Sequence, residues 1–139
     1  MNEPLSSIMV TDLITISPDD TIRTAFDTLR TKRIHHLPVT EGTKLVGILT
    51  THDIFKREAD PATYDQIKVS DWMTTKIATL NPTDKIGSLV LVLVENLFHA
   101  VPIVDADRNA VGIVTTLDVM KYSLGKEYPN RYEAWGGKS

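Results

Sequence analysis

GILTTHD (Gly47–Asp53) and GIVTTLD (Gly112–Asp118) are two copies of one motif, and this pairing decides the fold. Upstream of each motif, the same residues recur in the same order at a constant spacing. The recurring pairs are Met9 and Met73, Thr11 and Thr75, Thr15 and Thr79, Pro18 and Pro82, Asp20 and Asp84, Ile22 and Ile86, Leu29 and Leu93, His35 and His99, and Pro38 and Pro102. Because polar residues recur as well as apolar ones, the sequence predicts a duplicated unit with a duplicated site and a cleft between the copies.

Each copy reads as strand, helix, strand, strand, helix. The expected strands are short β-prone runs bounded by turn residues, at 13–16, 37–40, 45–49, 77–80, 101–104 and 110–114. Each expected helix begins at a capping residue: one at Asp20, one at Thr50 or Thr51 running to about Glu58, one at Asp84 running to about Asn96, and one at Thr115 or Thr116 running to about Leu124, where Gly125 ends it.

Short turns are expected at Ser6 and Ser70, just ahead of the two copies. The sequence therefore predicts one repeat at 5–58, a linker at 59–68, a second repeat at 69–124 and a C-terminal tail at 125–139.

Length and composition exclude several classes of protein. The 139 residues suffice for one compact domain, but each copy alone is near the lower size limit for folding, so the copies should bury apolar faces against each other. A net charge of −3 and a pI of about 5.7 offer no basic field for nucleic acid. No apolar run is long enough to cross a membrane, and the first residues lack the features of a signal peptide. The absence of cysteine excludes disulfides and fits a cytoplasmic location.

The run 89–94 is apolar on all sides if it is helical, whereas the matching helix of the first copy has an outer face with Asp27 and Arg30. Such a helix must be covered on both sides, by the core and by either a second subunit or the C-terminal tail. The alternative is a buried strand, which the match with the first copy disfavours. The C-terminal stretch 121–139 holds Tyr122, Tyr128, Tyr132 and Trp135. It either packs on this helix or a partner or is a mobile terminus.

The Thr-Thr-x-Asp end of each motif is suited to anion and sugar binding. A strand ends at the first Thr and a helix begins within one residue, so free N–H groups and the positive end of a helix dipole are available there. The carboxylates of Asp53 and Asp118 lie in the first turn, where each can accept hydrogen bonds from a vicinal diol such as ribose. The alternative is that Thr50 and Thr115 only cap helices in ordinary capping boxes with these Asp residues. Duplication of the whole pattern favours the binding role.

The repeat resembles a CBS (cystathionine-β-synthase) domain, and the chain resembles a tandem CBS pair, or Bateman module, over about 5–124. The segments that carry the resemblance are Ile8–Thr11 and Trp72–Thr75, Ser17-Pro18 and Asn81-Pro82, His36–Val39 and Ala100–Ile103, and the two Gly-to-Asp motifs. This resemblance implies an α+β fold of two β-α-β-β-α repeats packed through their sheets with pseudo-twofold symmetry. It also implies two clefts that bind adenosine compounds: AMP, ADP, ATP or S-adenosylmethionine.

The resemblance implies the residues of each site. The first site would use Thr15, Ile16, His36, Leu37, Pro38, Thr50, His52 and Asp53. The second would use Thr79, Leu80, Ala100, Val101, Pro102, Thr115, Leu117 and Asp118. The basic residues expected near phosphate, commonly in the site of the opposite repeat, are His35 and His99. Since the first site alone has His36 and His52, we expect the Asp53 site to favour the more charged ligand and the Asp118 site to be weaker or to take a less charged one.

Neither a metal site nor catalytic machinery is expected. His35 and His36 are adjacent and would project to opposite faces of an extended strand, so they cannot share one ion without distortion. No nucleophile elbow or acid–base pair is present, so no catalytic residue and no catalytic cofactor are assigned.

The sequence therefore predicts a regulatory sensor of adenosine ligands that is not an enzyme. A homodimer is expected through helices that include Leu89, Leu91 and Val92. The alternatives are a ligand-free dimerisation adaptor and a regulatory subunit of a separately encoded enzyme or transporter. No nucleic-acid or membrane partner is expected.

Overall fold

The computed structural model describes residues 1–130, which form two compact α+β units. The first-repeat unit contains Ile14–Ile77 and Arg108–Ala110. The second-repeat unit contains Met1–Leu13, Ala78–Asp107 and the described residues from Val111 to Asn130. The segment at the start of each predicted repeat, which contains Met9 in the first and Met73 in the second, thus belongs to the unit of the other repeat. The predicted repeat boundaries follow the sequence pattern, whereas the folded units exchange these two segments.

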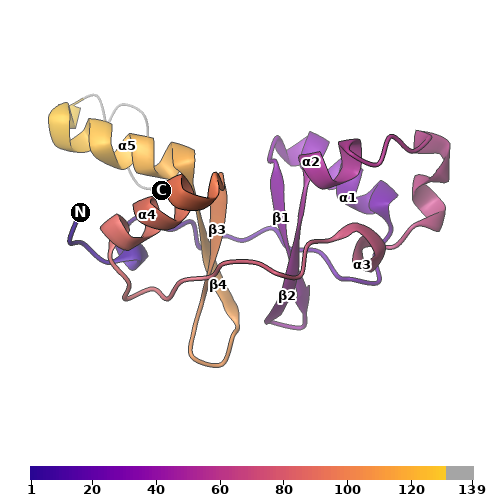
Figure 1. Cartoon of the computed structure of the whole chain (residues 1–139), viewed down its shortest axis with the longest axis horizontal. Coiled ribbons are helices and arrows are strands. Elements are labelled where there is room, and N and C mark those ends of the chain that lie inside the picture. Colours follow the sequence, from indigo (N-terminus) through magenta and orange to yellow (C-terminus); the bar gives the residue numbers. More distant parts are fainter. Residues whose placement is uncertain (131–139) are drawn as a thin grey trace. The chain divides into compact units, whose positions relative to one another are not determined.

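The first-repeat unit is built on a two-stranded antiparallel hairpin. Its elements in chain order are α1 (Ile22–Lys32), β1 (His36–Glu41), β2 (Lys44–Thr50), α2 (Thr51–Phe55), the 3-10 helix η2 (Pro61–Gln66) and α3 (Val69–Trp72) (Figure 1). The hairpin pairs His36 with Thr50, and Gly42 supplies the left-handed turn residue with φ 61°. Leu37, Val39 and Leu49 of the hairpin pack into one core with buried residues of α1.

The second-repeat unit has the same plan. It contains η1 (Leu5–Ser7), α4 (Ile86–Asn96), β3 (Ala100–Val104), β4 (Ala110–Thr115) and α5 (Thr116–Glu127), and β3 pairs with β4 (Figure 1). The central strands, the main helices and the two leading turns near Ser6 and Ser70 are confirmed. No helix among residues 1–130 is both long and apolar enough to traverse a bilayer.

The apolar run 89–94 is helical, as the match between the copies predicts. Leu89 is fully buried and Val92 is partly buried in the core of the second-repeat unit, whereas Leu91 is 60% exposed. The predicted homodimer interface was the helix that includes these three residues. The side chain of Leu89 faces the core of its own unit and is not available to a partner. Of the three predicted interface residues, Leu91 is the exposed one.

The predicted first strand of each repeat is wrong. Instead of strands at 13–16 and 77–80, each segment makes one isolated parallel bridge, Ile16 to Val39 and Leu80 to Ile103. Pro18 and Pro82 follow closely and have no N–H to donate, so the ladder cannot continue in that direction.

Two predicted helix caps and two predicted helix ends also differ. Thr21 caps α1 by accepting from the Thr24 N–H, and Lys85 precedes α4 without a side-chain cap. The Asp20 and Asp84 carboxylates instead accept from the backbone N–H groups of Ser17 and Asn81, at 3.0 and 2.7 Å. These two carboxylates therefore stabilise the turn before each helix.

Helix α2 ends at Phe55, short of Glu58, whose positive φ of 51° is not helical. Helix α5 passes through Gly125 and ends at Glu127. A helical glycine costs about 1 kcal/mol relative to alanine, which tertiary contacts can offset. One such contact is the Lys126 ammonium, which lies 2.8 Å from Glu3 Oε1.

Glu3 joins the start of the chain to α5. Its Oε2 accepts a hydrogen bond of 2.5 Å from the Tyr122 hydroxyl, while Oε1 meets Lys126. Lys126, and then Tyr122, hold the pKa of the Glu3 carboxyl well below its usual range. The same hydrogen bonds raise the pKa of Tyr122 and of Lys126. These contacts fix the first turn of the chain against the last helix of the same unit.

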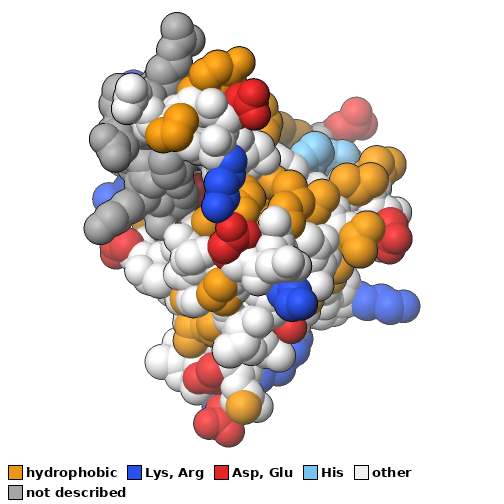
Figure 2. All heavy atoms as spheres, turned by 90° about the vertical axis from the view of Figure 1, so that its left-hand side faces the viewer, with side chains coloured by type: hydrophobic (Ala, Val, Ile, Leu, Met, Phe, Trp, Pro, Cys, Tyr) orange, Lys and Arg blue, Asp and Glu red, His pale blue; other side chains and the backbone are white. Residues whose placement is uncertain are grey.

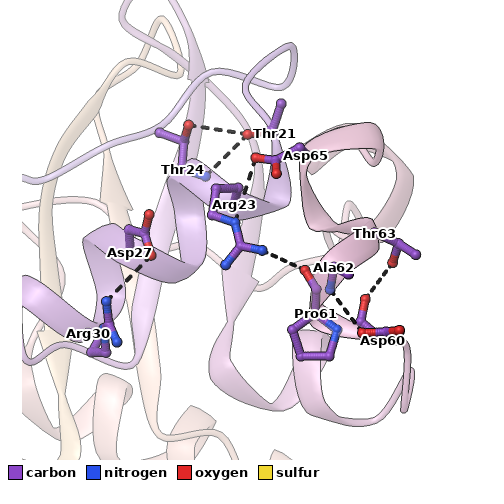
Figure 3. Close-up of polar contacts among 10 residues, drawn as sticks. All are labelled: Thr21, Arg23, Thr24, Asp27, Arg30, Asp60, Pro61, Ala62, Thr63 and Asp65. Atoms are coloured by element: carbon purple, nitrogen blue, oxygen red, sulfur yellow. Dashed lines mark hydrogen bonds and ion pairs between the residues drawn. The ribbon is translucent and has the colours of Figure 1, made fainter.

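The linker covers the outer side of α1 in the first-repeat unit. Arg23 Nη2 donates to the Pro61 carbonyl at 2.5 Å, and its Nε lies 3.6 Å from Asp65 Oδ1 (Figure 3). The Tyr64 ring packs against Phe26 and Trp72, with centroids 5.6 and 6.0 Å apart. The residues predicted as a linker are therefore an integral part of this unit.

Candidate functional site

Thr50 and Asp53 form a capping box at the start of α2. The Thr50 hydroxyl oxygen accepts from the Asp53 N–H at 3.1 Å, and Asp53 Oδ2 accepts from the Thr50 N–H at 2.9 Å. Asp53 is 4% exposed. The capping role that the sequence left open is therefore present in the first repeat.

The second oxygen of Asp53 is occupied as well. Oδ1 accepts from the Thr74 hydroxyl at 3.3 Å and lies 3.2 Å from the Lys56 ammonium. Thr74 reaches Asp53 because its backbone pairs with Ile48 of β2 through two hydrogen bonds of 2.9 Å. Both carboxylate oxygens thus have partners inside the first-repeat unit.

Thr115 and Asp118 form the matching box at the start of α5, with one difference. Asp118 Oδ2 accepts from the Thr115 N–H at 2.8 Å and from its hydroxyl at 3.0 Å. The side chain is 6% exposed, and Oδ1 has no hydrogen-bond or ion-pair partner within residues 1–130. Within the described residues, this oxygen therefore has no donor that a ligand hydroxyl would have to replace.

The difference between the boxes follows from the sequence of the exchanged segments. Val10 occupies the position in the second-repeat unit that Thr74 has in the first, pairing with Ile113 at 2.9 and 3.0 Å. Valine has no hydroxyl to donate to the carboxylate. Lys121 matches Lys56 in the repeat but makes no ion pair in the described part of the chain. Among residues 1–130, the valine at position 10 and the lack of an ion pair from Lys121 thus leave Asp118 Oδ1 without a donor.

The glycine of each motif permits the close approach of the exchanged segment. A Cβ added at Gly47 would lie 2.9 Å from both Met73 Sδ and the Thr74 carbonyl oxygen. One added at Gly112 would lie 2.8 Å from Met9 Sδ and 3.2 Å from the Val10 carbonyl oxygen. These roles were not predicted from the sequence, although the recurrence of a glycine in each motif together with Met9 and Met73 was a signal for them.

The other predicted ligand residues are divided between the two units. Those of the first site all belong to the first-repeat unit, and those of the second all belong to the second-repeat unit. Leu37 and Val101 are fully buried in the two cores, so their side chains face away from solvent. Exposed or partly exposed positions are Thr15, His36, His52, Thr79, Leu80, Ala100 and Leu117, whereas Ile16, Pro38 and Pro102 are buried.

The two predicted phosphate-proximal histidines occupy matching places. Their carbonyl oxygens accept from the first helical residues, His35 from the Thr51 N–H at 3.1 Å and His99 from the Thr116 N–H at 2.9 Å. Both side chains are exposed. His35 also lines a pocket between α1 and α2. No group of three His, Cys, Asp or Glu within residues 1–130 is placed to hold a metal ion.

Comparison with known proteins identifies the repeats. A family model described as the CBS domain matches residues 5–60 and 69–125. The CBS domain pair of protein MJ0100, solved in complex with 5′-methylthioadenosine and S-adenosyl-L-methionine, is 28% identical, with a TM-score of 0.80 over 91% of this chain and 99% of that one. The CBS domain-containing protein YhcV of Bacillus subtilis is 30% identical over 119 residues, which is 86% of this chain and 84% of YhcV.

Several relatives are much longer proteins. The inosine-5′-monophosphate dehydrogenase of Methanocaldococcus jannaschii is 32% identical over 123 residues, which is 88% of this chain but 23% of the dehydrogenase. The chain also spans 49% of protein MJ0188 from the same organism. The enzymes among these relatives therefore have most of their length outside the region they share with this chain.

Proposed function

This chain belongs to the CBS domain family, and from that membership we propose that it is a regulatory module that binds adenosine-containing ligands. The observation that carries the proposal is the duplicated Thr–Asp capping box, with Asp118 Oδ1 free of any partner within residues 1–130. An ionised carboxylate oxygen at the head of a helix accepts hydrogen bonds from the hydroxyls of a ribose. The ligands of the MJ0100 pair, 5′-methylthioadenosine and S-adenosyl-L-methionine, both carry a ribose.

We propose that the two sites are unequal and that the Asp118 site is occupied first. This order differs from the sequence-based expectation, which took the Asp118 site to be weaker or to bind a less charged ligand because His36 and His52 are found only in the first site. The hydrogen bonds add a second consideration. A ribose bound at Asp53 must share or displace the Thr74 hydroxyl and the Lys56 ammonium, whereas Asp118 Oδ1 has no such competitor. Displacing an internal donor from a buried carboxylate carries a desolvation cost that the second site does not have.

A thermal-shift and calorimetric screen tests the proposed function. AMP, ATP, S-adenosylmethionine and 5′-methylthioadenosine would be added separately to the purified chain. A ligand that binds only the folded state stabilises it by about 2.7 kcal/mol at 100 times its Kd, which raises the thermal midpoint by several degrees. We expect such a rise for at least one compound. No shift with any of the four would favour the ligand-free adaptor.

The exposed surface of the second-repeat unit supports self-association as a second role. Several large apolar side chains of α4 and α5 reach solvent, and hydrophobic groups are visible on that side in Figure 2. We name as the α4–α5 face the residues Leu91, Val94, Leu97, Phe98, Leu117 and Met120. Apolar faces of this kind mark interaction surfaces. We propose that two copies of the chain associate through it.

Leu91→Glu is expected to convert the homodimer to a monomer. Leu91 is 60% exposed, so a carboxylate there remains hydrated in the monomer but would be buried without a partner in the dimer. Sedimentation velocity at micromolar concentration measures the change. Thr31→Glu, at an exposed position of α1, is the matched control and should leave the dimer intact. A dimer that persists in Leu91→Glu would rule out the α4–α5 face as the interface.

Regulation of a separately encoded enzyme or transporter also fits a module of this class. The longer relatives, which include a dehydrogenase, have the shared region attached to further sequence. A pull-down with the tagged chain tests this role. Recovery of one partner would support it if the amount recovered changes when the adenosine ligand is added or removed. A ligand changes such an association only through its different affinity for the free and partnered states.

A further inference from the structure

A pocket of about 500 Å³ lies on the helical side of the first-repeat unit. It is lined by the C-terminal half of α1, the turn into β1, and α2. Its apolar lining includes Phe26, Leu29, Ile54 and Phe55, and its volume is in the range of small-molecule sites. Of the residues predicted for the adenosine sites, His35 is the one that lines this pocket. It is therefore a different place from the capping box.

Two guanidinium groups also line this apolar pocket. The Arg30 guanidinium lies 5.8 Å from the centroid of the Phe26 ring, and its Nη2 lies 3.8 Å from Asp27 Oδ1 (Figure 3). Both members of that ion pair are exposed, so the pair is weak and leaves Arg30 able to bind another anion. The Arg33 side chain has no hydrogen bond or ion pair within residues 1–130.

Stabilisation of a helix end does not account for Arg33. Cations near a helix C-terminus interact favourably with the helix dipole, and Arg30 and Lys32 already serve the last turn of α1. Arg33 follows as the C-cap in a left-handed conformation with φ 55°, which arginine rarely adopts and glycine adopts without strain. The matching C-cap of α4 is Leu97, with φ 56°. An arginine is therefore not required by the backbone geometry at this position.

The second repeat supplies an internal comparison. The positions that match Arg30 and Arg33 hold Val94 and Leu97, which lie on the exposed α4–α5 face. The same place in the duplicated fold is thus cationic in one copy and wholly apolar in the other. A guanidinium group presents several N–H donors in a planar fork, which matches the oxygens of a carboxylate, sulfonate or phosphate group.

We propose that this pocket binds a small amphipathic anion, with an aromatic or aliphatic body on the apolar lining and a carboxylate, sulfonate or phosphate group on Arg30 and Arg33. The ring of His35, which also lines the pocket, can add an N–H donor. This proposal does not depend on adenosine binding, because none of the capping-box residues lines the pocket.

Fluorescence titration with 8-anilinonaphthalene-1-sulfonate tests the proposal. Arg33→Gly removes one cation at a position where glycine fits the backbone, so the thermal midpoint should not fall. We expect this variant to bind the probe about ten-fold more weakly or worse, the effect of losing one charge-assisted hydrogen bond. Lys32→Ala is the matched control, because it removes a cation from the last turn of the same helix at a position outside the pocket lining. It should bind the probe as the unaltered chain does.

Competition with charged compounds and a double variant test whether the probe binds through its negative charge and in this pocket. Decanoate should displace the probe, whereas decyltrimethylammonium, with the same chain and the opposite charge, should not. Saturating AMP should leave the probe bound. Arg30→Val with Arg33→Leu, which copies the second repeat, should bind at least ten-fold more weakly. Unchanged binding in Arg33→Gly, a loss in Lys32→Ala, or equal displacement by the cationic competitor would each overturn the proposal.

Discussion

Asp118→Asn is expected to weaken adenosine-ligand binding about 100-fold. A ribose diol donates its hydrogen bonds to a charged acceptor, and each hydrogen bond to a charged group contributes about 1.5–3 kcal/mol. Asparagine retains one oxygen, which can still accept from the Thr115 N–H and keep the helix cap. Its NH2 group then takes the place of the open Oδ1 and cannot accept from the sugar. Isothermal titration with the ligand that gives the largest thermal shift measures the loss.

Asp53→Asn is the matched control for this prediction. Since Thr74 and Lys56 already use Asp53 Oδ1, we expect a change of a few-fold at most in the affinity of the principal site. The reciprocal variant, Lys56→Ala with Thr74→Val, removes both donors and copies the Val10 of the second repeat. It should raise the measured stoichiometry toward two ligands per chain. Equal losses in Asp118→Asn and Asp53→Asn would contradict the proposed inequality of the sites.

The sequence predicted the elements that depend on local pattern. Thr50 and Thr115 cap their helices as expected, because a hydroxyl and a carboxylate three residues later satisfy the free N–H groups without help from distant residues. The apolar run 89–94 was assigned correctly as helix because its counterpart in the first copy has clear helical periodicity. Duplication therefore resolved an ambiguity that one copy would have left.

The features that sequence reasoning missed depend on contacts between distant segments. The contact of the Thr74 hydroxyl with Asp53 requires that the segment ahead of the second repeat pairs with β2 of the first. No local periodicity encodes that exchange. In the sequence alone, the presence of Thr74 in one repeat and Val10 at the matching position of the other looks like an ordinary surface variation. The capping boxes were predictable, but the occupancy of their second oxygens was not.

Burial separates residues that the sequence pattern had grouped together. Leu37 and Leu89 lie in regular apolar patterns that describe a hydrophobic stripe without stating which of its members meets the core. Position along a strand or helix fixes the face of a side chain only when the neighbouring layer is known. Leu91 and Leu89 are two residues apart on the same helix, and the fold buries one and exposes the other.

Gly47→Ala is expected to destabilise the fold by about 2 kcal/mol, within the range for inserting a methyl group into a tightly packed site. The added Cβ would lie 2.9 Å from the Thr74 carbonyl oxygen. This oxygen cannot readily move away, because the N–H and the carbonyl group of Thr74 are both hydrogen-bonded to Ile48 of β2. Alanine in a strand gains about 0.5–1 kcal/mol over glycine from reduced conformational entropy of the unfolded chain, which offsets only part of the strain. Urea denaturation measures the shift in the free energy of unfolding.

Gly112→Ala provides the matched comparison in the second repeat. Its closest contact is Met9 Sδ at 2.8 Å, while the nearest backbone oxygen, that of Val10, stays at 3.2 Å. A methionine side chain has several rotatable bonds and can move, so we expect a loss of less than about 1 kcal/mol. Because the strain in Gly47→Ala falls on the residue whose hydroxyl contacts Asp53, that variant should also loosen the Thr74 contact. Equal destabilisation by the two variants would contradict this prediction, because the backbone at Thr74 would then move away from the added methyl group as readily as the Met9 side chain does.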